Sequence, residues 1–144
     1  MKEKAQKPIA TILVDNLTEV RKTLRSVLES HQDIEVVAEV DDTGEINDIV
    51  KEGVVTVIVL NIHMSEIKGI LNIKRIKSMG PGLPVIVLSF LSDPRYLQAC
   101  IRAGASGYIL LESAFDELPV AIRSVAEGNI YICKDLNTYS TNKY

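Results

Sequence analysis

The residues of this sequence best suited to chemistry are short polar side chains that follow apolar runs. Asp15 and Asn16 follow the run 9–14, Asn61 follows the run 54–60, and Ser89 follows the run 85–88. Carboxylate, amide and hydroxyl oxygens accept hydrogen bonds and can coordinate a divalent cation such as Mg²⁺. Only Asp15 carries a formal negative charge, so we expect the set to hold a cation weakly.

The elements that would position these residues can be read from the hydrophobic pattern. Strands are predicted over 9–14, 34–40, 54–60, 85–88 and 108–111, and helices over 17–31, 44–52, 68–79, 94–103 and 114–127. Strands that alternate with helices imply right-handed crossovers and a mostly parallel sheet. We therefore expect an α/β, flavodoxin-like, three-layer sandwich with five helices around a five-stranded parallel sheet in the order 2-1-3-4-5.

This strand order brings the polar residues together. The run 34–40 carries two glutamates, which indicates an edge strand with one wet face. The order reverses between the first and third strands, and ligands of open α/β sheets bind beyond the carboxyl ends of the strands at that point. Asp15, Asn61, Ser89 and Leu111 should therefore converge at one edge of the sheet.

Three helix starts carry capping signals, and one of them is Ser113 with Asp116, which suggests a cap of the helix over 114–127. Asp93 precedes Pro94, which is typical of an N-cap followed by proline at the first helical position. Asn16 and Glu19 have the spacing of a capping box and predict that Asn16 caps the helix over 17–31.

Four segments resemble motifs of the receiver domains of bacterial response regulators, the CheY-like family. The segments are Ile12-Leu-Val-Asp-Asn16, Val57-Ile-Val-Leu-Asn-Ile-His-Met64 with Gly69 beyond it, Val85-Ile-Val-Leu-Ser89 and Ala103-Gly-Ala-Ser-Gly-Tyr-Ile-Leu-Leu111. They stand in the family's order and spacing, and the resemblance runs from about Ile9 to Tyr131. The segments 33–39 and 127–131 are similar to the corresponding segments of receivers of LuxR/NarL-type helix-turn-helix regulators. The resemblance implies a receiver of two-component phosphorelay signalling.

The resemblance also assigns roles, and three residues depart from the family pattern. It places Asp15 and Asn16 at the acidic-pocket positions, Asn61 at the phosphoacceptor, Ser89 at the Ser/Thr switch, Tyr108 at the switch aromatic and Leu111 at the lysine. The family has an aspartate where Asn61 stands, and an amide is a poor nucleophile without charge. Asn16 removes a second charge, and Leu111 can neither pair with a phosphoryl group nor donate a hydrogen bond.

These departures lead to the hypothesis of a pseudo-receiver that is not an enzyme and acts by protein contacts. The resemblance implies a histidine kinase or an output domain or protein as partner, bound by the surface of the fourth helix, fifth strand and fifth helix over about residues 93–127. A homodimer is a further expectation. No cofactor is expected, and Asp15 would bind Mg²⁺ only weakly.

Other functions compete with this hypothesis. The chain could be the receiver half of a DNA-binding transcriptional regulator, or a receiver phosphorylated at a non-standard site such as His63. A flavodoxin-like enzyme or nucleotide binder is disfavoured, because such proteins hold phosphate on a glycine-rich or threonine-rich loop after the first strand. The segment 15–20 contains no glycine.

Composition narrows the class of protein. The 144 residues are 47% hydrophobic and 24% charged with a net charge of −3, which suits one globular domain without a nucleic-acid or anionic-membrane footprint of its own. No apolar run is long enough to span a membrane, and Cys100 and Cys133 lack metal or redox spacing. We expect a cytoplasmic protein with a disordered segment 1–8, a receiver domain 9–131 and a polar tail 132–144.

Overall fold

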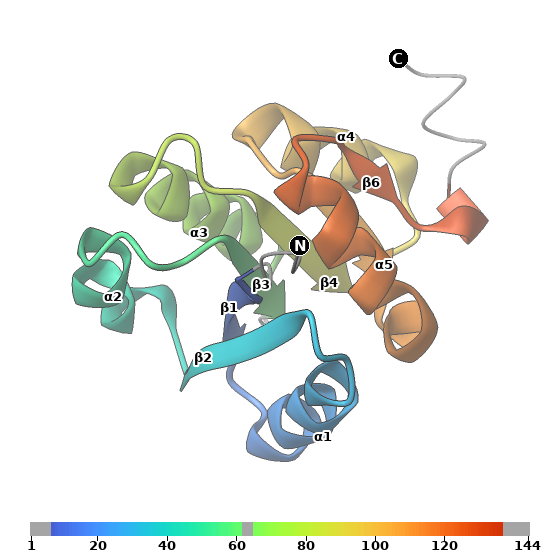
Figure 1. Cartoon of the computed structure of the whole chain (residues 1–144). Helices are drawn as coiled ribbons and strands as arrows, with labels where there is room; N and C mark the ends of the chain where they lie inside the picture. Colours follow the sequence, from blue (N-terminus) through green and yellow to red (C-terminus); the bar gives the residue numbers. More distant parts are fainter. Residues whose placement is uncertain (1–6, 62–64, 137–144) are drawn as a thin grey trace.

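The computed structural model describes residues 7–61 and 65–136, which form one sheet between two layers of helices (Figure 1). The strands are β1 Ile9–Asp15, β2 Ile34–Val40, β3 Val57–Asn61, β4 Val85–Ser89, β5 Gly107–Leu110 and β6 Tyr131–Ile132. The helices are α1 Thr18–Glu29, α2 Asn47–Lys51, α3 Glu66–Met79, α4 Pro94–Ala103 and α5 Ala114–Ala126. All strand pairs are parallel. Helix α1 packs beside α5 on one face of the sheet, and α3 packs beside α2 and α4 on the other.

The sheet has six strands in the order β2-β1-β3-β4-β5-β6, so the predicted count of five strands was wrong while the order 2-1-3-4-5 was confirmed. The additional strand β6 lies along β5, where the backbone N–H of Tyr131 donates to Ser106 and that of Cys133 donates to Tyr108. A strand of two residues has no hydrophobic period, and for this reason the sequence pattern does not reveal it.

Packing continues past residue 131, where the predicted receiver domain ends. Cys133 and Leu136 are both buried in the hydrophobic core. Of the predicted segment 1–8 and tail 132–144, residues 1–6 and 137–144 lie outside the described residues. No helix in the described part of the chain is long and apolar enough to cross a bilayer.

The predicted edge and centre of the sheet match the burial of the strands. β3 is buried along its whole length, whereas β2 alternates between buried and exposed residues over its first half and forms one edge of the sheet. A strand covered by helices on both faces needs apolar residues throughout, and an edge strand does not. In the register of β1 and β3, Asp15 lies directly beside Asn61.

One of the three predicted helix caps was correct in full, and Ser113 stands at the N-cap of α5 but makes no side-chain cap hydrogen bond. The Asp93 carboxylate accepts the backbone N–H of Arg95 at 2.9 Å, with Pro94 at the first helical position. The predicted cap by Asn16 was wrong, because Leu17 stands at the N-cap of α1 without a side-chain cap. Instead, the Asp15 carboxylate accepts a hydrogen bond from the backbone N–H of Leu17, at 2.8 Å.

Candidate functional site

The centre of the candidate site is a buried contact between the last residues of β1 and β3. Asp15 is 1% exposed and Asn61 is 2% exposed. The Asn61 side-chain Nδ2 donates to Asp15 Oδ2 at 2.8 Å, and the Leu17 N–H donates to Asp15 Oδ1 at 2.8 Å. Each carboxylate oxygen of Asp15 therefore accepts a hydrogen bond from a neutral donor of the protein, as a buried carboxylate needs.

The direction of the Asn61 amide follows from its neighbour. An ionised carboxylate can only accept hydrogen bonds, so the amide must turn its NH₂ group and not its oxygen toward Asp15. A rotated amide would place two acceptor atoms about 3 Å apart without a proton between them. Asn61 therefore presents a hydrogen-bond donor, and not an oxygen that could bind a metal ion, toward Asp15.

Arg21 closes the site from the α1 side, and the sequence interpretation missed it. Its Nη1 donates to the backbone oxygen of Asp15 at 2.9 Å and to Asp41 Oδ1 at 2.6 Å, and its Nε donates to Glu39 at 3.3 Å. The hydrogen bond that Arg21 donates to the Asp41 carboxylate is the main cause that raises the pKa of Arg21 above its ordinary value. A positive charge therefore lies next to the backbone of Asp15, held between that backbone and the carboxylates of Glu39 and Asp41. The sole sequence signal was its place one turn into the helix that follows Asp15.

A second hydrogen-bonded group lies at the end of β4. Ser89 is half-buried, and its Oγ accepts the backbone N–H of Leu91 at 3.0 Å. The Tyr108 hydroxyl donates to the carbonyl of the same Leu91 at 2.5 Å. Ser89 and Tyr108 therefore hold one short turn from two sides. Sequence interpretation identified both residues but not Leu91, which acts through its backbone and carries no side-chain signal.

Tyr108 lies inside the protein. It is 0% exposed, and its ring meets that of Tyr96 edge to face, with centroids 6.1 Å apart. Burial raises the pKa of the Tyr108 hydroxyl above its ordinary value, so the group is a neutral donor. The Tyr96 hydroxyl in turn lies over Gly69, where an added Cβ would come within 2.2 Å of it. The inward position of Tyr108 thus depends on packing between α3, α4 and β5.

Leu111 stands just past β5, in a short 3₁₀ turn over Leu111–Ser113. It lines an apolar groove of about 360 Å³ between α1 and α5, together with Val20, Phe90 and Phe115 among others. The position that the resemblance assigns to a lysine thus forms part of an apolar wall.

The remaining predicted residues lie at the border of the site. Asn16 is exposed at the start of the β1–α1 connection. His63 lies outside the described residues. Among the residues that the structure does describe, no three His, Cys, Asp or Glu side chains are grouped so as to hold a metal ion.

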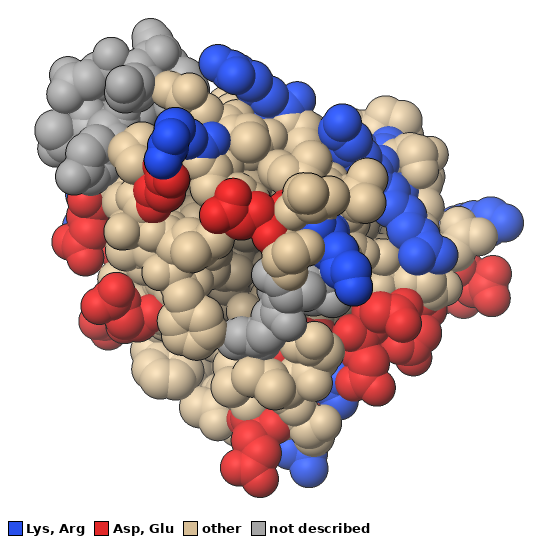
Figure 2. All heavy atoms as spheres, turned by 180° about the vertical axis from the view of Figure 1, so that it is seen from behind, with Lys and Arg blue, Asp and Glu red and all other residues tan. Residues whose placement is uncertain are grey.

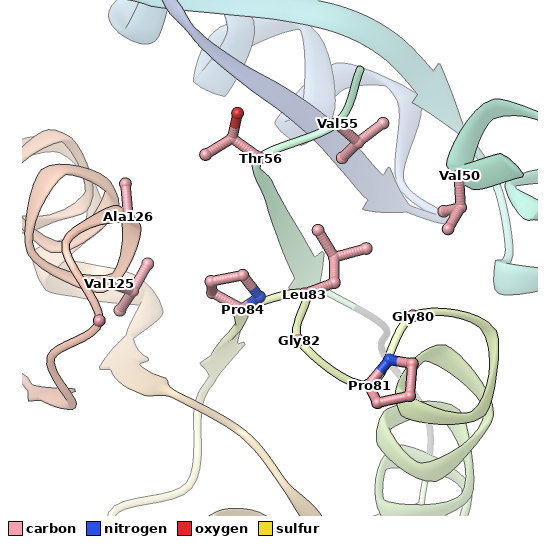
Figure 3. A pocket seen from close by; sticks show the side chains of 11 residues that line it. Val50, Val55, Thr56, Gly80, Pro81, Gly82, Leu83, Pro84, Val125 and Ala126 are labelled. Atoms are coloured by element: carbon pink, nitrogen blue, oxygen red, sulfur yellow. The ribbon is translucent and has the colours of Figure 1, made fainter. Parts of the chain in front are cut away.

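Another hollow, of about 510 Å³, lies at the opposite end of the sheet (Figure 3). Its lining comes from α2, from the residues before β3 and β4, and from the end of α5, and includes Val50, Thr56, Leu83, Pro84 and Val125. No ionisable side chain is among these lining residues. Its walls offer little chemistry beyond one hydroxyl group and backbone atoms, so the candidate site stays at the carboxyl ends of the strands.

Comparison with known proteins agrees with this geometry. The response regulator receiver domain family matches residues 11–123. The oxygen regulatory protein NreC of Staphylococcus haemolyticus is 29% identical over 134 residues, which is 92% of this chain and 62% of the relative. The transcriptional regulatory protein DegU of Brevibacillus brevis is 30% identical over 124 residues, which is 86% of this chain and 52% of the relative. The chain therefore spans only between half and two thirds of these relatives.

Solved structures show the same fold. The non-phosphorylated receiver domain of the stress response regulator RcsB from Escherichia coli is 26% identical with a TM-score of 0.78, covering 89% of this chain and all of that one (100%). A LuxR-family two-component response regulator from Aurantimonas sp. SI85-9A1 has a TM-score of 0.84 at 23% identity, covering 95% of this chain and 98% of that one, a likeness that concerns the fold alone.

Proposed function

Because this chain belongs to the response regulator receiver domain family, we propose that it is a pseudo-receiver, a two-component signalling module that works through protein contacts without phosphoryl transfer. The observation that carries the proposal is the buried hydrogen bond from the Asn61 amide to the Asp15 carboxylate. It puts a neutral, non-nucleophilic group at the position that the family resemblance assigns to the phosphoacceptor.

The chemistry at two of the altered positions, Asn61 and Leu111, supports this proposal. An attack on phosphorus needs an oxygen nucleophile, and the amide of Asn61 has only a weakly nucleophilic carbonyl oxygen. Charge on a phosphoryl group needs nearby cations or donors to stabilise it. Leu111 can offer neither, because its side chain is part of an apolar wall.

The described residues also fit Mg²⁺ poorly. Mg²⁺ needs near-octahedral oxygen ligands, usually with at least one free carboxylate. Both oxygens of Asp15 already accept hydrogen bonds, the nearest side-chain atom of Asn61 is an N–H donor, and the guanidinium of Arg21 lies against the same backbone. We infer that the site neither requires nor tightly binds the cation, and no step of the proposed function depends on one.

Contacts with partners would then carry the signal. The expected surface comprises α4, β5 and α5, with a histidine kinase or an output domain or protein as the partner. β6 bears on this proposal, because it pairs with the outer edge of β5. A partner or a second copy could therefore use the helices α4 and α5, whereas the edge of β5 at Gly107 and Tyr108 is already paired with β6.

A second candidate function is the receiver half of a DNA-binding regulator. It is favoured by the relatives NreC and DegU, of which this chain matches only 62% and 52% of the length. The coding sequence that follows Tyr144 in the gene decides between the two: a helix-turn-helix domain there would make the module a regulator of DNA binding, and a stop codon would leave it a stand-alone receiver.

The experiment that tests the pseudo-receiver is incubation with Mg²⁺ and a small acyl phosphate, followed by intact-mass analysis. We expect no phosphoryl adduct on the natural chain. A chain with Asn16→Asp, Asn61→Asp and Leu111→Lys is the positive control and should gain one phosphoryl group. A stoichiometric adduct on the natural chain would overturn the proposal, and mapping that adduct to His63 would establish the non-standard site instead.

A further inference from the structure

Two exposed apolar surfaces of this domain complement each other, and we propose that one copy binds the next head to tail through them. The first surface, the α1–α5 groove, comprises Val20, Phe90, Leu111 and Phe115, bordered by Glu19 and Glu112. The second, the α3 ridge, comprises Ile67, Leu71, Lys74 and Arg75. The occupant of the groove would be the α3 ridge of a second copy of this chain.

The α1–α5 groove is apolar inside and acidic at its border. Phe90 is 70% exposed and Phe115 is 54% exposed, which is unusual for aromatic side chains on a small domain. Glu19 and Glu112 are the only charged residues among the described lining residues, and both are exposed acids. The groove therefore suits an apolar segment that carries positive charge at its side.

The α3 ridge has that character. Ile67 is 72% exposed and Leu71 is 58% exposed, and their spacing of four residues puts them one turn apart on the same face of α3. Lys74 and Arg75 are exposed one turn further along the same face. The face thus presents two apolar anchors followed by two basic residues, the pattern of a helix that lies in a hydrophobic groove.

Charge selects this pairing over a symmetric one. Contact between two α1–α5 grooves would bring Glu19 and Glu112 of each copy toward the same acids of the other, and like charges in an interface disfavour it. Contact between a groove and an α3 ridge brings acids toward Lys74 and Arg75. In the space-filling view Lys and Arg gather toward the upper right, the largest group of Asp and Glu lies directly below them on the right, and tan surface with smaller acidic groups covers the lower left (Figure 2).

The placement of the two surfaces determines the form of the assembly. Helices α1 and α5 lie on one face of the sheet, and α3 lies on the other with α2 and α4. One contact therefore leaves a free α3 ridge on one copy and a free groove on the other, so further copies can add. Such heterologous contacts give open chains, or rings if the rotation closes. The surfaces are small, so we expect weak association that grows with protein concentration.

The inference uses only these two surfaces and does not depend on whether Asn61 accepts a phosphoryl group. The first test is sedimentation velocity of the chain over a wide range of concentrations. We expect the mean mass to rise beyond that of a dimer, and added salt to lower it because exposed charge pairs are screened. Either a constant monomer mass at all concentrations or growth that stops at a dimer would overturn the proposal, and a constant monomer mass would leave the groove to a different protein.

Mixing two variants gives the sharper test. Phe115→Glu blocks the groove, and Leu71→Glu blocks the α3 ridge, at two positions that are more than half exposed and should still fold. The association constant of each variant alone should be about tenfold or more below that of the natural chain, because the new glutamate would be buried at the contact. Mixed, they should form a one-to-one complex that grows no further, since one intact groove meets one intact ridge.

The matched control is Val54→Glu, an equally exposed apolar position at 57% on neither surface, which should associate like the natural chain. Circular dichroism of each variant checks the fold. Failure of the mixed variants to associate, with both folded, would overturn head-to-tail binding, as would self-association of either variant alone at the natural strength.

Discussion

The substitution Asn61→Asp tests the central contact of the candidate site directly. In the natural chain a neutral amide donates to Asp15 Oδ2 at 2.8 Å, and both residues are at most 2% exposed. The variant replaces this donor by a second carboxylate at the same distance. We expect a chain that is less stable than the natural one near neutral pH and that gains stability from Mg²⁺.

The magnitude follows from the distance. Two unit charges 2.8 Å apart repel by about 6 kcal/mol at an effective dielectric constant of about 20. Side-chain rotation and water entry relieve part of this repulsion, so the free energy of unfolding should fall by about 3 kcal/mol. The like charge raises the pKa of one carboxyl group of the pair. The loss is therefore full above that raised pKa and disappears as the pH falls below the ordinary carboxyl range.

Urea unfolding followed by circular dichroism, with and without Mg²⁺, measures this change. A cation that binds only the folded variant at ten times its dissociation constant adds about 1.4 kcal/mol of stability. The natural chain should gain almost nothing, since its amide already satisfies Asp15. The control is Asn129→Asp, an exposed position where the same substitution should be nearly neutral with or without the cation.

Two results would refute the reasoning. One is a variant Asn61→Asp that is as stable as the natural chain near neutral pH without Mg²⁺, which would mean that the two side chains do not face each other. The other is equal stabilisation of the natural chain and the variant by Mg²⁺, which would mean that the Asn61 amide does not exclude the cation.

Two further predictions concern the surroundings of the site. Gly69→Ala should lower the free energy of unfolding by about 1–3 kcal/mol, because the added Cβ would lie 2.2 Å from the Tyr96 hydroxyl. Adding Tyr96→Phe to the same chain should relieve most of that loss. Urea unfolding of both variants checks this, and a double variant that is as unstable as Gly69→Ala alone would contradict it. Hydrogen bonding from Arg25 is the main cause that lowers the pKa of Glu39 below its ordinary 4.5. At pH values above 4.5, Glu39→Gln should therefore lower the free energy of unfolding by about 1 kcal/mol, and this difference should vanish as the pH falls through the lowered pKa. A difference that persists in acid would exclude the ion pair as its cause.

The sequence alone was sufficient for the parts of the protein that local chemistry specifies. The apolar run 57–60 of β3 and the half-polar run of β2 indicated the central and edge strands, because burial on one or two faces determines which residues a strand tolerates. Asp93 with Pro94 gave the start of α4, because that cap uses only neighbouring residues. The parallel order of the strands then implied that Asp15 and Asn61 meet.

Tertiary structure decided what depends on residues far apart in the chain. The partner of the Asp15 carboxylate is an amide 46 positions away, and its donor direction follows from that meeting. The side chain of Asp15 accepts the hydrogen bond from the backbone N–H of Leu17 at the start of α1, where the sequence pattern predicted a cap by Asn16. The strand β6 is too short to carry a period of its own and exists because β5 offers an edge. Side-chain type is encoded locally, but a hydrogen bond or a groove forms only where the fold brings distant groups to the same place.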